Sequence, residues 1–296
     1  GGSGSISGAG NYGQIQSIIN QGTINIASGQ TLTLGGIGWS NTGTITADGA
    51  TVNLSGSFTT AGLGTFSAVG GTVNLTGTVD NTGNTLSLNS GLGSWYLRGG
   101  SIVGGTLTHS DTSKLVLTNS GGTLSGLTVA AGMVIDGTQL NSNYPQNSNS
   151  VSVVNGLVLN GSLLLGKADG STSGTMYFNG MQTLGGTGVV TFGNSVNNGL
   201  IENGNGTVAL TIGSGITVQG GSGSISGAGN YGQIQSIINQ GTINIASGQT
   251  LTLGGIGWSN TGTITADGAT VNLSGSFTTA GLGTFSAVGG TVNLTG

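Results

Sequence analysis

Short runs in which apolar residues alternate with Thr, Ser or Asn recur along most of the chain. One series comprises TINI at 23–26, TITA at 44–47, TFSA at 65–68, TLSL at 85–88 and TLTH at 106–109. Alternation with a period of two predicts β-strands that have one buried and one solvated face. The threonines that begin these runs are almost evenly spaced along the chain. Like residues therefore recur at a nearly fixed interval.

A second series keeps the same interval and predicts another side of the same coil. It comprises LTL at 32–34, VNL at 52–54, VNL at 73–75, WYL at 95–97 and LVL at 115–117. Further along, 151–166 and 175–193 each divide into three short apolar runs separated by Gly or Asn-Gly. We therefore expect three short strands per coil of about 20–24 residues, with coils stacked about 4.8 Å apart.

This pattern predicts an all-β fold, a right-handed parallel β-helix (β-solenoid). The coils are too long and too variable for the left-handed hexapeptide type, and right-handed crossovers are the rule for parallel strands. Corners fall at Asn20, Asn41 and Asn81, each followed two positions later by Gly. These corners supply residues that tolerate positive φ.

The chain also repeats on a larger scale. Residues 1–77 return unchanged as 220–296, so the second copy begins directly after position 219. We therefore expect 1–219 to be one complete unit and 220–296 to begin an identical unit within one continuous solenoid. Because distinct terminal caps are missing, the sequence is typical of a slice through a longer array. Roughly ten coils per unit would extend about 50 Å.

Composition supports strands and excludes several functions. Gly accounts for 65 residues and Pro145 is the single proline, so helices are disfavoured and strand ladders are uninterrupted. Charged residues make up 3%, against about 25% in ordinary domains. With only three cations, nucleic-acid binding is not expected. No apolar run reaches the ~18 residues of a membrane span, and cysteine is absent.

No cofactor or metal site is predicted. Gly8, Gly10 and Gly13 match the dinucleotide fingerprint G-x-G-x-x-G, but a chain with this much glycine yields about three such matches by chance. The calcium-binding pattern G-G-x-G-x-D is not met, because serine stands where the carboxylate is needed.

An enzyme is not expected, although one charged cluster has to be weighed. Arg98, His109, Asp111 and Lys114 lie within about one coil, and Asp80 lies about one coil before Arg98. Cleavage of a sugar linkage needs two positioned carboxyl groups, and no second carboxylate is close in sequence. His109 occupies an otherwise apolar column, so we expect a ring with a backbone partner. A polysaccharide-cleaving β-helix remains the lowest alternative.

The candidate contact surface is uncharged. It comprises Thr23, Thr44, Thr65, Thr85, Thr106, Tyr96 and Tyr144. The threonines form an outward ladder similar to those of ice-binding β-solenoids, whereas Tyr96 is an outward aromatic suited to carbohydrate. Tyr144 lies in the aperiodic polar segment 136–150, which predicts a lateral loop. Trp39 and Trp95 instead replace apolar residues of the inward columns, so both are expected in the core.

The segments NTGTITADGATVNLSGSFTTAGLGTF (41–66) and GGTVNLTGTVDNTGNTLSL (70–88) carry a family resemblance. They resemble repeats of giant bacterial surface proteins of the filamentous-haemagglutinin or autotransporter-passenger type. That resemblance implies an extracellular or cell-surface β-helix that serves as a fibre or as the shaft of an adhesin. Its partners would be identical units, end to end and laterally, and carbohydrate in the adhesin case.

Overall fold

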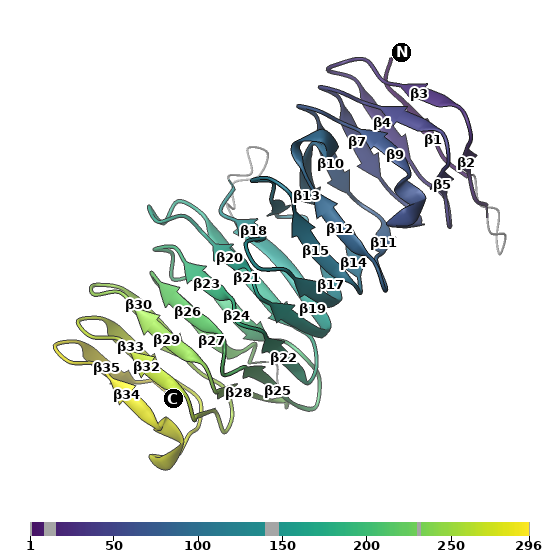
Figure 1. Cartoon of the computed structure of the whole chain (residues 1–296). Helices are drawn as coiled ribbons and strands as arrows, with labels where there is room; N and C mark the ends of the chain where they lie inside the picture. The colour runs from purple at the N-terminus through teal and green to yellow at the C-terminus, as the bar shows by residue number, and fades with distance from the viewer. Residues whose placement is uncertain (1, 9–15, 140–147, 230–231, 296) are drawn as a thin grey trace.

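The computed structural model describes residues 2–8, 16–139, 148–229 and 232–295. These residues form one rod of stacked coils built almost entirely from parallel strands (Figure 1). Three single-turn 3-10 helices interrupt the corners: η1 (Ala61–Leu63), η2 (Ser90–Leu92) and η3 (Ala280–Leu282). The predicted parallel β-helix is confirmed, and the second copy continues the solenoid of the first.

Each coil has up to three strands, which we assign to faces A, B and C in chain order. Face A is one 13-stranded sheet: β1 (Gly4–Ile6), β4 (Thr31–Leu34), β7 (Thr51–Leu54), β10 (Thr72–Leu75), β13 (Ser94–Leu97), β16 (Leu115–Leu117), β18 (Val134–Gly137), β20 (Ser162–Leu165), β23 (Val189–Phe192), β26 (Thr217–Gly220), β29 (Thr242–Ile245), β32 (Thr263–Thr265) and β34 (Thr284–Ser286).

Faces B and C carry the second and third strands. Face B holds β2 (Ile19–Asn20), β5 (Ser40–Asn41), β8 (Ser57–Thr59), β11 (Thr78–Asp80), β14 (Ser101–Val103), β21 (Ser173–Phe178), β24 (Gly199–Glu202), β27 (Gly223–Gly227), β30 (Thr250–Leu253), β33 (Thr270–Leu273) and β35 (Thr291–Leu294). Face C holds β3 (Thr23–Asn25), β6 (Thr44–Thr46), β9 (Thr65–Ser67), β12 (Thr85–Leu88), β15 (Thr106–His109), β22 (Gln182–Gly185), β25 (Thr207–Ile212), β28 (Ile234–Asn239) and β31 (Ser259–Asn260). Two strands, β17 (Thr123–Val129) and β19 (Ser148–Leu159), continue from face B onto face C.

The predicted apolar columns stack as expected. On face A, Val52 pairs with Val73 and Leu54 with Leu75, one coil apart. Trp95 continues the Val73 column and is fully buried, and Trp39 is also in the core, stacked on Phe58 with ring centroids 4.5 Å apart. Because each coil buries its apolar row only against its neighbours, the core is one continuous column along the rod.

Coil length varies more than the sequence pattern indicates. Near the start of face A, Leu54 pairs with Leu75, which agrees with the predicted interval. Further along, Leu163 pairs with Val190 and Val190 with Val218, so these coils are longer. Longer second and third strands and wider corners account for the additional length.

The unit 1–219 is correspondingly shorter in coils than predicted. Nine steps along face A lead from β1 to β26, and the second copy of β1 is the next strand, β27. The unit therefore spans nine and one-third coils, rather than roughly ten.

Gly83 uses the tolerance for positive φ at one of these corners, with φ 69°, whereas the asparagines act through their side chains. Among the described residues, Asn155 is the only non-glycine with positive φ. Asn41 is instead buried, and its Nδ2 donates to the carbonyl oxygens of Leu63 and Thr65 in the next coil at 3.0 and 2.9 Å. Its Oδ1 accepts from Asn20 Nδ2 at 2.8 Å. These side chains satisfy backbone carbonyls that the turning chain leaves unpaired.

The segment 136–150 is not all loop. Asp136 and Gly137 end β18, and 148–150 begin β19, so strand pairing continues into both ends of the predicted loop. Residues 140–147, including Tyr144 and Pro145, lie outside the described part of the chain.

Stacking predicts opposite outcomes for two glycines in identical sequence contexts. A Cβ at Gly241 would lie 2.4 Å from the Ile216 carbonyl oxygen of the preceding coil, whereas a Cβ at Gly22 would meet nothing closer than 3.9 Å. We expect Gly241→Ala to destabilise the fold by about 1–3 kcal/mol through overpacking. Gly22→Ala, the matched control, should be neutral. Urea unfolding of both variants checks this, and equal effects would contradict the stacking at the unit boundary.

Candidate functional site

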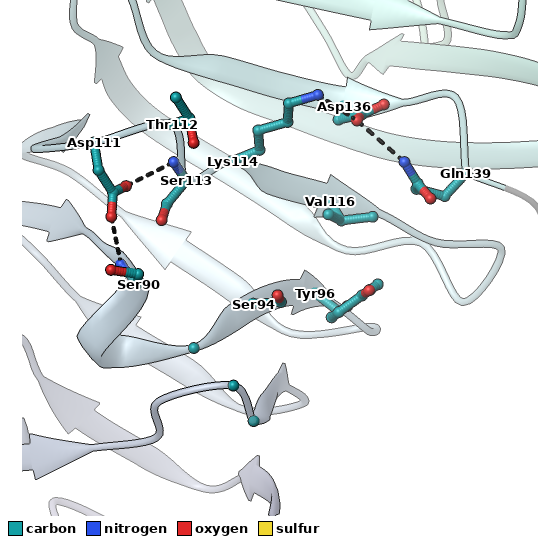
Figure 2. A pocket seen from close by; sticks show the side chains of 13 residues that line it. Ser90, Ser94, Tyr96, Asp111, Thr112, Ser113, Lys114, Val116, Asp136 and Gln139 are labelled. Atoms are coloured by element: carbon teal, nitrogen blue, oxygen red, sulfur yellow. Dashed lines mark hydrogen bonds and ion pairs between the residues drawn. The ribbon is translucent and has the colours of Figure 1, made fainter. Parts of the chain in front are cut away.

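A groove of about 410 Å³ lies over face A strands β13, β16 and β18 and the corners next to them. Figure 2 shows that its side chains come from successive coils. We call it the Tyr96 groove, and its side chains include those of Ser90, Ser94, Tyr96, Asp111, Lys114 and Asp136. Hydroxyl, carboxylate and ammonium groups thus line the groove together with one aromatic ring.

The outward column of face A explains why the groove forms there. Asn74 donates to Asn53 Oδ1 at 2.8 Å, continuing a side-chain ladder that begins at Thr33. The next residue in register is Tyr96, followed by Val116 and Asp136. Since a phenol ring cannot continue a ladder of amide side chains, the row of hydrogen-bonded amides ends at Tyr96. Tyr96 is half-buried at this change.

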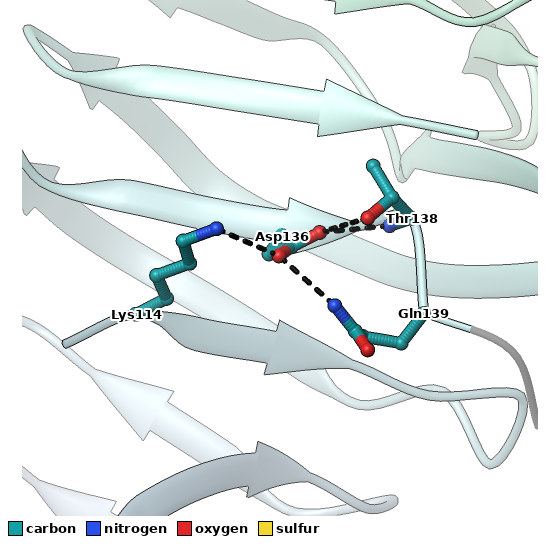
Figure 3. Close-up of polar contacts among 4 residues, drawn as sticks. All are labelled: Lys114, Asp136, Thr138 and Gln139. Atoms are coloured by element: carbon teal, nitrogen blue, oxygen red, sulfur yellow. Dashed lines mark hydrogen bonds and ion pairs between the residues drawn. The ribbon is translucent and has the colours of Figure 1, made fainter. Parts of the chain in front are cut away.

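Asp136 is the most constrained charged residue of the groove (Figure 3). It is 2% exposed and pairs with the half-exposed Lys114 ammonium, with Nζ 3.2 Å from Oδ2. Thr138 donates its N–H and hydroxyl to Oδ1 at 3.0 and 2.6 Å, and Gln139 Nε2 donates to Oδ2 at 3.2 Å. Burial raises the pKa of Asp136, but the hydrogen bonds from Thr138 and the contact with Lys114 outweigh it and hold the pKa below 3.8.

Asp111 is the second carboxylate of the groove. It accepts hydrogen bonds from the backbone N–H groups of Ser90 at 2.6 Å and Ser113 at 2.7 Å. Hydrogen bonds from Ser113 and Ser90 hold the pKa of Asp111 well below its ordinary value. Both carboxyl groups of the groove are thus ionised near neutral pH, so neither holds the proton that acid-catalysed glycoside cleavage needs.

The predicted charged cluster is assembled only in part. Asp111 and Lys114 line the groove, whereas Arg98, His109 and Asp80 do not. The half-buried His109 ring stacks in register over Leu88, and its Nδ1 contacts the Asp111 carbonyl, which confirms the expected backbone partner. Sequence reasoning missed Asp136. The register pairs Asp136 with Val116, so adding one coil length to Lys114 leads to Val134 and would not have found the contact.

The threonine ladder is divided. Strand pairing places Thr23, Thr44 and Thr65 in one column and Thr85 with Thr106 in another. Among the described strands, β9 and β12 are not paired, and the corner helix η2 contacts β9 instead. The five threonines therefore do not form one uninterrupted pleated array. Of the other candidate contact residues, Tyr96 lines the groove and Tyr144 falls outside the described residues.

Glu202 is an ionisable group that sequence reasoning did not single out. It occupies the inward column of face B, between Phe178 and Gly227 of the adjacent coils, and is fully buried. Gly204 N–H donates to Oε1 at 2.7 Å, while Oε2 has no hydrogen-bond partner among the described residues. Burial raises the pKa of Glu202 above 4.5, although the Gly204 hydrogen bond opposes the shift.

Within the described ranges, no cluster of His, Cys, Asp or Glu could hold a metal ion, and no helix is long and apolar enough to cross a membrane. Comparison of the chain with family models, curated proteins and solved structures finds no match. The function therefore has to be argued from the geometry of the rod and of its groove.

Asp136→Asn should destabilise the protein by about 2 kcal/mol at neutral pH, since an amide cannot accept all the hydrogen bonds of this buried carboxylate. The difference should shrink as pH falls below 3.8, because the stability due to the lowered pKa is lost there. Asp169→Asn is the control: Asp169 accepts the same pair of bonds from Ser171 in an exposed turn. Denaturant unfolding at two pH values measures both, and equal losses would refute the role of burial.

Glu202→Gln should remove a pH dependence of stability. Because the folded-state pKa is raised, Glu202 destabilises the fold progressively as pH rises from 4.5 through the folded pKa. The aspartates with lowered pKa are already ionised in that range and do not contribute. Urea midpoints measured from pH 5 to pH 8 should fall for the wild type and stay level for Glu202→Gln. Equal pH dependence of the two urea midpoints would show that folding does not raise the pKa of Glu202.

Proposed function

We propose that this protein is a structural repeat segment of an extracellular bacterial fibre or surface filament. Tandem units would join into a rigid β-solenoid rod, with identical units as the end-to-end partners. The proposal rests on how the second copy begins, on the composition of the surface, and on the resemblance of the repeats to those of giant bacterial surface proteins.

The seam between the two copies is the observation that supports this most directly. Strands β24, β25 and β26 of the first unit pair in parallel with β27, β28 and β29 of the second. At the first coil, an apolar hollow of about 240 Å³ lies open between Ile18, Ile24 and Trp39. The corresponding residues Ile237, Ile243 and Trp258 enclose only about 10 Å³, because the preceding coil covers them. The end of one unit thus complements the beginning of the next.

The surface composition favours association between rods. Only 3% of the residues are charged, and the Lys114–Asp136 pair is the single salt bridge within the described part of the chain. Faces lined by hydroxyl and amide groups have little like-charge repulsion to keep neighbouring molecules apart. Lateral contact between rods is therefore part of the proposed function.

The shaft of a cell-surface adhesin is the second candidate, and the Tyr96 groove favours it. An aromatic ring flanked by hydroxyl and carboxylate groups suits hydrogen bonding and stacking with a sugar. Ice binding through the threonine faces has weaker support, since the ladder is divided. Polysaccharide cleavage also has weak support, because both groove carboxylates are ionised.

Electron microscopy of chains with one, two and three tandem units tests the rod. At about 4.8 Å per coil, each added unit should lengthen a straight particle by about 45 Å without changing its width. Globular beads joined by flexible links, or particles whose length does not grow with unit number, would contradict the proposal. Binding of the same chains to a glycan array would favour the adhesin shaft.

A further inference from the structure

Identical segments of the two copies lie on different faces of the solenoid. The TVNL segment at 51–54 forms β7 and pairs with β4 and β10 on face A. The same four residues at 270–273 form β33 and pair with β30 and β35 on face B. Sequence identity thus fixes which strands are neighbours, but it does not fix the face that carries them.

The change of face applies to the whole repeated region. Strands β1, β4, β7 and β10 of face A recur as β27, β30, β33 and β35 on face B. Strands β2 and β5 recur on face C as β28 and β31, and β3, β6 and β9 of face C recur on face A as β29, β32 and β34. All three faces are permuted in the same cyclic order.

The cause is the length of the unit in coils. Since the unit 1–219 occupies nine and one-third coils, each copy starts one face later than the copy before it. The original phase returns only after three units, or twenty-eight coils, which is about 135 Å along the axis. Independently of any twist between coils, each unit therefore rotates the next copy by a third of a turn about the rod axis.

We infer that an array of these units presents each surface feature in three rows, a third of a turn apart around the rod. The inference uses the tandem array of the proposed function, whereas the phase itself belongs to this chain. The Tyr96 groove would lie on face A in one unit, on face B in the next and on face C in the third. Successive grooves would be about 45 Å apart along the axis.

The partner that fits this arrangement is a second copy of the rod on every side. Each face of the array carries strands equivalent to those of faces A, B and C of the first copy. No face therefore presents only one strand type to a ligand. The threonine strands show this within the present chain: Thr23 and Thr44 lie on face C, but their equivalents Thr242 and Thr263 lie on face A. Rods that associate through any one patch therefore contact neighbours in three directions and form a three-dimensional bundle.

Thiol cross-linking in the present chain tests the phase. Gln219 of β26 and Asn244 of β29 are exposed register partners on face A. If the second copy kept the phase of the first, β29 would lie on face C, as its equivalent β3 does, and Asn244 would not lie beside Gln219. The chain contains no cysteine, so paired substitutions face no competing thiol. A short bifunctional thiol reagent should cross-link Gln219→Cys with Asn244→Cys and leave Gln219→Cys with Thr252→Cys uncrosslinked.

If Gln219→Cys and Asn244→Cys do not cross-link although the control pair does, the inference is overturned without affecting the proposed rod. Thr191→Cys with Gln219→Cys, which are paired within the first unit, is the positive control for reactivity on face A. Electron microscopy of chains with three or more units tests the bundle. Bundles several rods thick in every lateral direction are expected, and flat ribbons one rod thick would contradict contact in three directions. If such chains form no rods, the proposed function fails while the cross-linking result stands.

Discussion

The structure depends on the stacking of parallel coils at one spacing. A coil cannot pair its own backbone N–H and C=O groups or bury its own apolar row, so both requirements are met by the coils on either side. The effect is visible in identical residues: Leu75 is fully buried between two coils, whereas its copy Leu294 is 77% exposed in the last one. The residue type is the same, and only the neighbour differs.

Polar groups obey the same constraint. The buried corner asparagines bond to carbonyl groups one coil away, and the pattern of Asn41 is repeated by Asn260 with Leu282 and Thr284. On the outer surface, ladders of amide and hydroxyl side chains also join successive coils, although these side chains are less buried. The stability of the rod therefore comes from repeated short contacts rather than from ion pairs, so salt should affect it little. Asp136 and Glu202 are the two buried carboxyl groups that depart from this scheme.

Alternation and interval predicted the strands, the columns and the core positions of Trp39 and Trp95, because these depend only on which residues recur one coil apart. The same pattern failed where the interval changes. Asp136 was placed in a loop since its surroundings are polar, and its contact with Lys114 depends on a register that no local signal gives. The pattern also did not predict which face each strand of the second copy joins. Identical strands fit any face, and the phase depends on the summed length of all the coils between them.

The parallel strands give the rod a direction. Ile18, Ile24 and Trp39 lie open at the first described coil, whereas their copies Ile237, Ile243 and Trp258 are covered by the coil before them. A completed coil is a template on which the next coil of the chain can order itself, because strand partners are never much more than one coil apart in sequence. Such a chain can acquire its structure progressively, one coil after another.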